Sequence, residues 1–436
     1  MYCGKAFFRY GETMSSYYLE GGNKIYGEVK ISPAKNSVLA LACASVIIDD
    51  EIFLTDCPDI GDVRVLSEVL EESGVTVRRN ADGLYIDGRS VFTPEISKNN
   101  GSKIRASFFL TGALLSKFGY AVMPLPGGCK LGVRPVDIHI DGLIKMGAKV
   151  KAYEDRIVFY AGKLKGAKIN LRYPSVGATE NLILAAVKAE GETVIKGSAK
   201  EPEVKDLCDF LNLCGAEISG GGTDEIVIRG VKRLHGKISY RAVPDRIEAG
   251  TFLTLCYLLG GKVLISGVNS QNICSLTEKI LDNTCNNGAL YVNIYSDKIY
   301  IQSDGKLRGF GNLKTGPYPA FPTDLHPIIA CAAAGLDGET IISETVFSSR
   351  FGYLEQLRKL GAEFAVENDK VTVFGGKLKG AKTTAPDLRG GAGLVVASLV
   401  AEGKSVVEKA EVIMRGYERF DKKLSSIGAK IKLRES

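Results

Sequence analysis

Tryptophan is absent from the 436 residues, and histidine occurs only three times, as His139, His235 and His326. With so few imidazoles and no CxxC pair, a zinc site is difficult to assemble. Ten cysteines without regular spacing argue against a disulfide scaffold and indicate free thiols in a reducing compartment. Although the net charge is +6, lysine and arginine do not cluster, and without tryptophan a nucleic-acid-binding protein is disfavoured.

Long hydrophobic runs are also missing. Runs such as Leu253–Leu259 and Leu394–Val400 fall far short of the roughly 20 residues that a membrane-spanning helix needs. The first 18 residues contain no sustained apolar segment of the kind found in secretory signals. We therefore expect a cytoplasmic, globular protein that does not engage a membrane, and the length predicts two or three domains.

The chain repeats one short pattern, in which an amphipathic helical stretch ends at a glycine and an alternating, strand-like stretch follows. A glycine after the last helical residue is the expected stop, because glycine enters the left-handed region without steric cost. Successive copies are 67 to 73 residues apart, and each predicts an order of strand, helix, strand, helix, strand, strand. The six glycines are Gly74, Gly147, Gly215, Gly288, Gly361 and Gly428.

Six units in two domains predict an α/β protein with three units in each lobe. The helix interiors are strongly apolar, for example Asn181–Val187, so we expect buried helices with the sheets outside. A break is expected near Tyr240–Asp245, which contains Pro244. Two lobes of this size would hold a ligand in a cleft between them.

The segment Met123–His139 is the most informative for chemistry. Within it, Cys129 lies between Gly127–Gly128 and Lys130, with Arg134 close by. Neighbouring cations favour a thiolate or bind an anion, although composition alone favours a turn with an incidental cysteine and surface charges. The other cysteines lie mostly in apolar stretches and are expected to be inert core, as at Cys43, Cys256 and Cys331.

The loop LPGGC with RPVD after it resembles the catalytic loop of the UDP-N-acetylglucosamine 1-carboxyvinyltransferase family, which begins peptidoglycan synthesis. The resemblance runs in order from about Leu19 to the C-terminus and implies the two-lobed enolpyruvyl-transferase fold. Further segments that carry it are GGNKIYGEVKISPAKN (Gly21–Asn36), KIRAS (Lys103–Ser107), SVGATEN (Ser175–Asn181), PDRIEAGTF (Pro244–Phe252), PYPAFPTD (Pro317–Asp324), ETVFSSRF (Glu344–Phe351), DLRGGAGLVVA (Asp387–Ala397) and RGYERF (Arg415–Phe420).

We expect one lobe over residues 36–243, with a mobile Cys129 loop that closes when ligand binds. The other lobe is expected to be discontinuous and to combine residues 1–35 with 244–436. Periodicity alone does not establish that the opening strand pairs with the second half of the chain. The active site is expected in the cleft between the lobes.

The resemblance implies transfer of the enolpyruvyl group of phosphoenolpyruvate to the 3-hydroxyl of UDP-N-acetylglucosamine, with release of phosphate through a tetrahedral intermediate. Such a reaction needs an acid for the methylene carbon, a base for the sugar hydroxyl, and fixed cations for phosphate and carboxylate. The resemblance further implies two small-molecule substrates, phosphoenolpyruvate and UDP-N-acetylglucosamine, and no metal, cofactor, nucleic acid, membrane or obligate protein partner. The resemblance also implies alkylation of Cys129 by the epoxide antibiotic fosfomycin.

By resemblance, Cys129 is the acid, Asp324 is the base, and Lys35 and Arg415 complete the catalytic groups. Phosphoenolpyruvate is expected at Lys35, Asn36, Arg134, Arg389 and Arg415. The nucleotide sugar is expected at Arg105, Arg134, Pro135, Val136, Asp137, Ile138, Ser175, Val176, Gly177, Asp324, Val346 and Arg350.

Several of these residues have a plainer interpretation on spacing alone. Asp324 follows Thr323 before an apolar stretch, which is also the pattern of a helix N-cap. Any one arginine in isolation is most often a solvated surface charge. Asp387 is expected to orient Arg389 or neighbouring groups.

Two other functions remain open at this point. A 3-phosphoshikimate carboxyvinyltransferase has the same fold and donor, but that family lacks a cysteine in this loop, and no NAGTA-type segment is found. A non-catalytic paralogue would bind the nucleotide sugar without turnover. The presence of Lys35, Cys129, Asp324 and Arg415 favours an active enzyme over such a paralogue.

Overall fold

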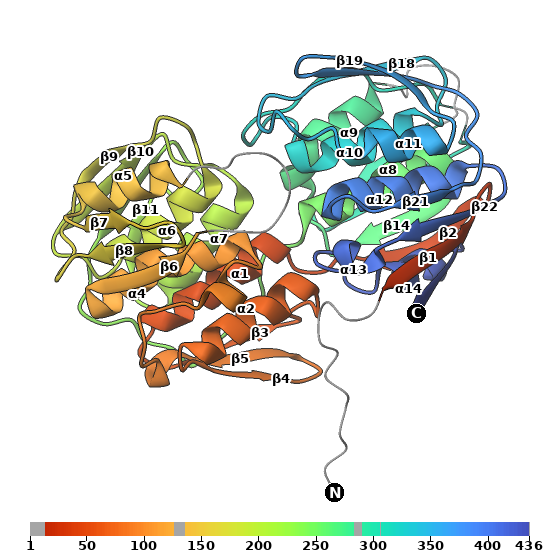
Figure 1. Ribbon diagram of the computed structural model, residues 1–436. Helices are drawn as coiled ribbons and strands as arrows, with labels where there is room; N and C mark the ends of the chain where they lie inside the picture. Colours follow the sequence, from red (N-terminus) through yellow and green to blue (C-terminus); the bar gives the residue numbers. More distant parts are fainter. Residues whose placement is uncertain (1–13, 126–135, 283–289, 306, 436) are drawn as a thin grey trace, which may run out of the picture. The chain divides into compact units, whose positions relative to one another are not determined.

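The computed structural model describes residues 14–125, 136–282, 290–305 and 307–435. These residues fall into two compact units with three sheets each (Figure 1). Unit 1 takes the residues up to Lys30, Ile247–Thr315 and those from Thr323 onward; unit 2 takes Ile31–Arg246 and Gly316–Pro322.

Three short stretches, 31–35, 244–246 and 316–322, belong to unit 2, whereas the sequence analysis expects them in the second lobe. Hydrogen bonds explain this for the first two. Ala34 N donates to Val243 O at 2.7 Å, and Asp245 N donates to Ser32 O at 2.9 Å. The two stretches therefore hold one another in unit 2.

Unit 2 contains three sheets with helices between them. The first joins β13 (Ile238–Tyr240), β3 (Glu51–Thr55), β5 (Gly83–Asp87) and β4 (Thr76–Arg79); the second joins β6 (Tyr120–Pro124), β8 (Arg156–Tyr160) and β7 (Lys149–Ala152); the third joins β11 (Glu217–Ser219), β12 (Glu225–Arg229), β10 (Glu192–Lys196) and β9 (Lys168–Asn170). The helices are α1 (Lys35–Ala44), α2 (Gly61–Glu72), α3 (Lys98–Gly101), α4 (Leu110–Phe118), α5 (Asp137–Lys145), α6 (Val176–Ala186) and α7 (Pro202–Leu213).

Unit 1 is built in the same way. Its sheets join β15 (Leu290–Ile294), β16 (Lys298–Ser303), β14 (Gly261–Ser266) and β2 (Ile25–Lys30); β17 (Gly311–Lys314), β18 (Glu339–Ser343), β20 (Lys370–Phe374) and β19 (Glu363–Glu367); and β21 (Lys382–Thr384), β22 (Lys404–Glu408), β1 (Ser15–Glu20) and β23 (Lys430–Glu435). Its helices are α8 (Arg246–Leu259), α9 (Cys274–Leu281), α10 (His326–Ala333), α11 (Leu354–Lys359), α12 (Leu388–Val400), α13 (Ala410–Ile413) and α14 (Phe420–Ser426).

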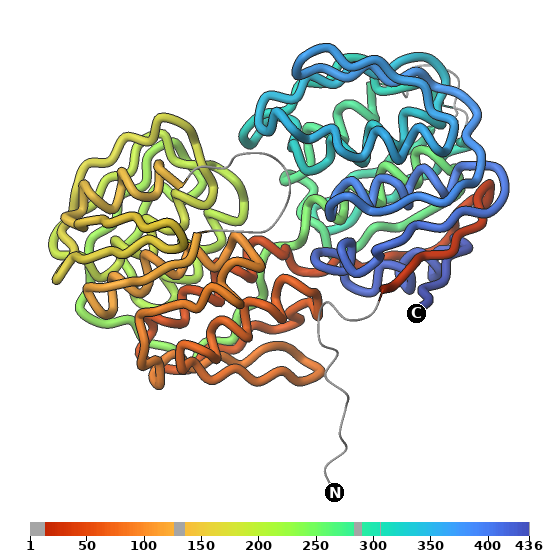
Figure 2. The backbone as a smooth tube through the Cα atoms, in the orientation of Figure 1, coloured from red at the N-terminus to blue at the C-terminus, as the bar shows by residue number. Residues whose placement is uncertain are grey.

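The predicted order of strand, helix, strand, helix, strand, strand is confirmed most simply in β9, α6, β10, α7, β11 and β12. Distant segments complete other repeats. β1 pairs antiparallel with both β22 and β23, and the red and blue tubes run side by side in Figure 2. β2 pairs parallel with β14. The N-terminal strands thus supply the missing strands of unit 1.

The first long helix of each repeat is buried, as its apolar composition predicts. In α6 every residue from Ala178 to Ala186 is buried, and in α12 every residue from Arg389 to Leu399. α4 packs against α6, and α10 packs against α12. The sheets lie around these helices in Figure 1, so each unit has a helical core of the kind expected.

The glycine stops are confirmed at the five positions that the structure describes. Each has a φ angle between 89° and 98°, a backbone conformation that residues with a Cβ atom adopt only with strain. They are Gly74, Gly147, Gly215, Gly361 and Gly428. In the part of the chain that the structure describes, no helix has both the length and the apolarity to cross a membrane.

Candidate active site

Lys35 begins α1 in unit 2, where three carboxylates hold the helix start. Asp245 Oδ2 accepts from the Lys35 backbone N at 3.3 Å, because the N-cap residue Ala34 offers no side-chain acceptor. The ammonium of Lys35 donates to Asp62 Oδ2 at 3.0 Å, and Asp62 is 5% exposed. Asn36 follows, half-buried, in the same first turn.

The third carboxylate belongs to Asp206 on α7. It accepts from the hydroxyl of Ser37, from Tyr240 Oη at 2.7 Å and from Val243 N at 3.1 Å. Burial raises the pKa of Asp206 despite these hydrogen bonds. The carboxyl group therefore links α1 to α7 and to the stretch that carries Asp245, and Lys35 and Asn36 begin a helix with little freedom to move.

The segment Ser175–Gly177 is the start of α6. Ser175 caps the helix, since its hydroxyl accepts from Ala178 N at 3.3 Å. A Cβ atom at Gly177 would lie 2.9 Å from Phe109 Cε1 and 3.4 Å from His139 Cε1. The glycine allows the imidazole to pack against the backbone of this predicted nucleotide-sugar segment.

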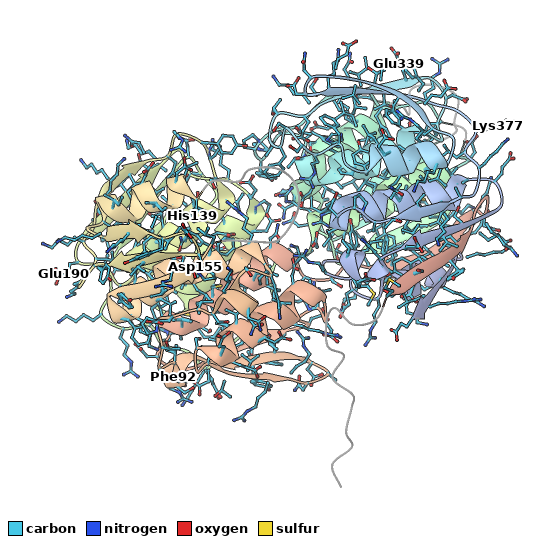
Figure 3. The ribbon with its side chains drawn as sticks, viewed as in Figure 1. Phe92, His139, Asp155, Glu190, Glu339 and Lys377 are labelled. Carbon is cyan, nitrogen blue, oxygen red and sulfur yellow. The ribbon has the colours of Figure 1, made fainter. Side chains whose placement is uncertain are left out.

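A chain of hydrogen bonds determines the tautomer of His139, which lies in the interior of unit 2 (Figure 3). Gly112 N donates to Asn181 Oδ1 at 2.7 Å, so the amide nitrogen of Asn181 must face His139 Nδ1, 3.0 Å away. Nδ1 is then the acceptor, and the ring proton is on Nε2. Burial, with help from the Arg105 charge, lowers the pKa of His139 to about 3.

This lowered pKa predicts a pH-dependent stability. Below about pH 6.5, His139 is protonated in the unfolded chain but not in the folded chain. The free energy of unfolding therefore decreases as the pH is lowered, by up to about 1.4 kcal/mol per pH unit. His139→Gln lacks this titrating group. We therefore expect the difference in the free energy of unfolding between wild type and His139→Gln to be smaller at pH 5 than at pH 7. Urea unfolding at both pH values measures this; an identical difference between the two proteins at both would contradict it.

Asp137 and Ile138 form the first turn of α5, directly after Val136. The carboxylate of Asp137 pairs with the guanidinium of Arg172, which also contacts Asp141 at 3.2 Å. These side chains are half-exposed, so their ion pairs add little to stability. They do connect α5 to the turn before Ser175, and the two predicted nucleotide-sugar segments are thereby joined within unit 2.

In unit 1, Asp324 lies between two buried arginines. Arg350 Nη2 donates to Asp324 Oδ1 at 2.8 Å, and Arg389 Nε donates to Asp324 Oδ2 at 3.2 Å. Arg350 is 2% exposed and Arg389 is 4% exposed, which excludes the surface-charge interpretation for both. The N-cap residue of helix α10 is Leu325, so Asp324 does not occupy the N-cap position that its spacing suggested.

Asp387 is the N-cap of α12, the helix on which Arg389 is the second residue. Its carboxylate accepts from the backbone N atoms of Arg389 and Gly390, each at 3.0 Å. The expectation that Asp387 orients Arg389 is therefore met through the backbone. The guanidinium of Arg389 also lies 5.3 Å from the ring centroid of Tyr417.

Glu344, the residue directly after β18, connects the segments around Asp324. One carboxylate oxygen accepts from Val346 N, Phe347 N and Thr315 Oγ1 at 2.9, 3.1 and 3.0 Å. The other accepts from Thr323 Oγ1 at 2.9 Å and faces His326 Nδ1 at 2.8 Å. Glu344 is 2% exposed, and it contacts the backbone of Val346, a predicted sugar-binding residue.

The remaining predicted residues lie on other elements or outside the described residues. Arg105 begins a 3-10 helix, Arg105–Phe109, and Arg415 lies half-buried between α13 and α14. Cys129, Arg134 and Pro135 lie outside the described residues. The core assignment of the other cysteines is confirmed by burial, which also raises the thiol pKa values, at Cys43, Cys256 and Cys331.

Within unit 1 the structure brings together three of the predicted residues, Asp324, Arg350 and Arg389. In unit 2 it adds Asp62 and Asp245 to Lys35, neither of which the sequence analysis singled out. Asp62 is 27 residues from Lys35 in the sequence, and no local sequence pattern predicts that the two side chains pair. Glu344 lies inside a segment that carries the family resemblance, but its fivefold role as an acceptor is visible only in the fold.

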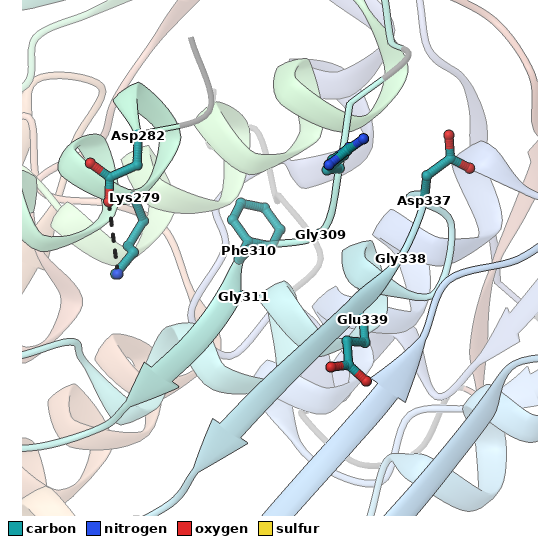
Figure 4. Close-up of a pocket in the computed structure, with 9 residues that line it drawn as sticks. Lys279, Asp282, Gly309, Phe310, Gly311, Asp337, Gly338 and Glu339 are labelled. Atoms are coloured by element: carbon teal, nitrogen blue, oxygen red, sulfur yellow. Dashed lines mark ion pairs between the residues drawn. The ribbon is translucent and has the colours of Figure 1, made fainter. Parts of the chain in front are cut away.

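A hollow of about 340 Å³ in unit 1 has no predicted residue in its lining (Figure 4). It lies between Phe310, Arg308 and Glu339, and the nearby Lys279 and Asp282 form a 3.8 Å ion pair. The lining mixes both signs of charge. The lining includes none of Asp324, Arg350 and Arg389, so the hollow is separate from that cluster.

Comparison with known proteins agrees with this architecture. The family model described as EPSP synthase (3-phosphoshikimate 1-carboxyvinyltransferase) matches residues 19–424. A solved structure of the enolpyruvyl transferase NikO from Streptomyces tendae has a TM-score of 0.85 at 24% identity, covering 97% of this chain and 100% of that one. EPSP synthase from Acinetobacter baumannii has a TM-score of 0.72 at 21% identity, covering 96% of this chain and 100% of the other.

Two curated relatives are more similar in sequence. UDP-N-acetylglucosamine 1-carboxyvinyltransferase 3 of Caldanaerobacter subterraneus is 41% identical, covering 96% of this chain and 99% of the relative. UDP-N-acetylglucosamine 1-carboxyvinyltransferase 2 of Listeria monocytogenes (strain EGD-e) is also 41% identical, covering 95% and 96%. With both the family model and these relatives spanning nearly its whole length, the chain belongs to the EPSP synthase family of enolpyruvyl transferases.

Proposed function

We propose that this protein is a UDP-N-acetylglucosamine 1-carboxyvinyltransferase, which transfers the enolpyruvyl group of phosphoenolpyruvate to the 3-hydroxyl of the nucleotide sugar and releases phosphate. The observation that carries this proposal is the identity of about 40% with relatives of that name along almost the whole chain. The reaction is the first committed step of peptidoglycan synthesis, and we place it in the cytoplasm.

In this reaction Cys129 supplies the proton that the methylene carbon of phosphoenolpyruvate gains. Asp324 takes the proton from the sugar 3-hydroxyl as its oxygen bonds to the neighbouring carbon. The tetrahedral intermediate then loses a proton from the new methyl group together with phosphate, which restores the double bond. Proton transfers of this kind need an acid and a base held in reach of the reacting atoms.

The cations act on the anionic groups of the donor. Lys35, Arg134, Arg389 and Arg415 bind the phosphate and carboxylate of phosphoenolpyruvate, where the planar fork of arginine pairs two oxygens at once. In the structure Asp324 already engages the guanidinium of Arg389. An incoming anion competes for that guanidinium, so donor binding and the release of the base are coupled. That the groups of both units act in one cleft remains a prediction.

A parallel assay of phosphate release tests the proposal. The protein is incubated with phosphoenolpyruvate and either UDP-N-acetylglucosamine or 3-phosphoshikimate, and we expect release only with the nucleotide sugar. Release with 3-phosphoshikimate would instead support the activity named in the matching family model. Release with neither, from protein shown to be folded by circular dichroism, would contradict both and favour a non-catalytic paralogue.

A further inference from the structure

We propose that Glu344 is a positioning residue that sets the sugar-contacting backbone of Val346 and the base Asp324 in one fixed relation. This inference rests on the proposed function and names a residue to which the resemblance assigned no role. Glu344 touches no reacting atom in this proposal. It acts through the neighbours that its two carboxylate oxygens hold.

The first oxygen organises the backbone after β18. Oε1 accepts from Val346 N and Phe347 N, at 2.9 and 3.1 Å, so the chain turns around the carboxylate. The hydroxyl of Thr315, at the end of β17, donates to the same oxygen at 3.0 Å. With its N–H committed to Glu344, Val346 is left with its carbonyl for the ligand.

The second oxygen reaches Asp324 through a chain whose polarity is determined. A guanidinium only donates, so Arg350 Nη1 donates to Thr323 Oγ1 at 3.2 Å, and the Thr323 hydroxyl must donate onward to Glu344 Oε2 at 2.9 Å. The other arm of Arg350 holds Asp324 at 2.8 Å. A shift of Glu344 would therefore be transmitted to Asp324 through Thr323 and Arg350.

His326 and Tyr353 keep this carboxylate in its ionised, acceptor-only form. His326 Nδ1 donates to Glu344 Oε2, and the Tyr353 hydroxyl donates to His326 Nε2 at 3.0 Å. A carboxylate oxygen only accepts, so Nδ1 of His326 carries a proton toward Glu344. Burial lowers the pKa of His326 and favours the neutral ring, in which Nε2 accepts from Tyr353. Burial alone would raise the pKa of Glu344, but the donors from His326, Val346 and Phe347 outweigh it and hold it below its usual value.

The test is Glu344→Gln, which keeps the shape but replaces one acceptor oxygen with an NH₂ donor. In either orientation of the amide, N–H groups then face donors that the carboxylate accepted. We expect kcat to fall about 10²-fold, because a displacement near 1 Å at a base has that cost. The KM for UDP-N-acetylglucosamine should rise about tenfold, because the backbone of Val346 loses the hydrogen bonds that hold it. The KM for phosphoenolpyruvate should stay within about twofold of wild type, because Arg389, which contacts Asp324, is only one of its five predicted ligands.

The matched control is Glu339→Gln on the same strand, where Glu339 is exposed, and we expect wild-type kinetics from it. A purely structural role for Glu344 would lower the melting temperature without separating the two KM values. Direct titration of UDP-N-acetylglucosamine by calorimetry gives a binding readout that does not depend on turnover.

Thr323→Val provides a second arm that removes only the link to Asp324. It should lower kcat about tenfold with both KM values unchanged, since the two hydrogen bonds that pass through the Thr323 hydroxyl are lost. This variant decides the matter if Glu344→Gln does not fold. Wild-type kcat in folded Glu344→Gln, or in Thr323→Val where the former is unfolded, would overturn the inference. Wild-type protein that releases no phosphate with the nucleotide sugar would instead overturn the proposed function.

Discussion

Asp324→Asn is expected to lower kcat by about 10²–10⁴-fold, the range that a positioned general base contributes. The substitution keeps the size of the side chain but removes the charge and the ability to take a proton from the sugar hydroxyl. The KM for UDP-N-acetylglucosamine should change less, because Asp324 is only one of the twelve residues at which the nucleotide sugar is expected. Steady-state phosphate release, with each substrate varied in turn, measures both effects.

The same substitution leaves Arg350 and Arg389 without the carboxylate that now joins them. Because both guanidinium groups are buried, we expect the free energy of unfolding to fall by about 1–3 kcal/mol, the usual cost of an unsatisfied buried polar group. Kinetics should therefore be measured well below the melting temperature of the variant. Asp337→Asn, at an exposed turn of unit 1, is the control. A folded Asp324→Asn protein with kcat within threefold of wild type would rule out the assignment.

Lys35→Met is expected to lower kcat/KM for phosphoenolpyruvate by about 10²–10³-fold, the effect of removing one charge-stabilising donor from an active site. The ammonium is half-buried and is held by Asp62 at 3.0 Å, while Asp245 and Asp206 immobilise the helix turn behind it. The ammonium group is therefore preorganised, and it needs little rearrangement to bind the anionic phosphoenolpyruvate. The KM for UDP-N-acetylglucosamine should stay within about twofold.

Lys188→Met is the matched control in the same unit. Its ammonium pairs with Asp49 at 3.2 Å, and its side chain is 17% exposed, against 16% for Lys35. Both variants remove a half-buried lysine from an ion pair, and the larger loss of stability is expected for Lys35→Met, because the side chain of Asp62 is 7% exposed and that of Asp49 is 35% exposed. If the two variants lose kcat/KM to the same extent, the effect is structural and Lys35 has no special role toward the donor.

Much of this protein follows from local sequence. The spacing of the glycines predicts six repeats because each marks a helix end where a left-handed residue is required, and the positive φ values of Gly74, Gly147 and Gly361 bear this out. Two strands also begin directly after a glycine with positive φ: β10 follows Gly191, and β22 follows Gly403. The helix caps at Ser175 and Asp387 are likewise local, because a cap joins residues only two or three apart.

The tertiary structure decided what joins residues far apart in the chain. The sequence predicts one opening strand, which corresponds to β2, but only the fold shows that β2 pairs with β14 and that β1 completes a sheet with β22 and β23. Likewise, the sequence identified Lys35 and Asp324 as candidates for chemistry. Only the fold shows that Asp62 holds Lys35, and that Arg350, Arg389 and the hydrogen bonds of Glu344 hold Asp324. The physical reason is that caps, turns and amphipathic periods arise between neighbouring residues, whereas buried charges must find partners wherever the packed helices bring them.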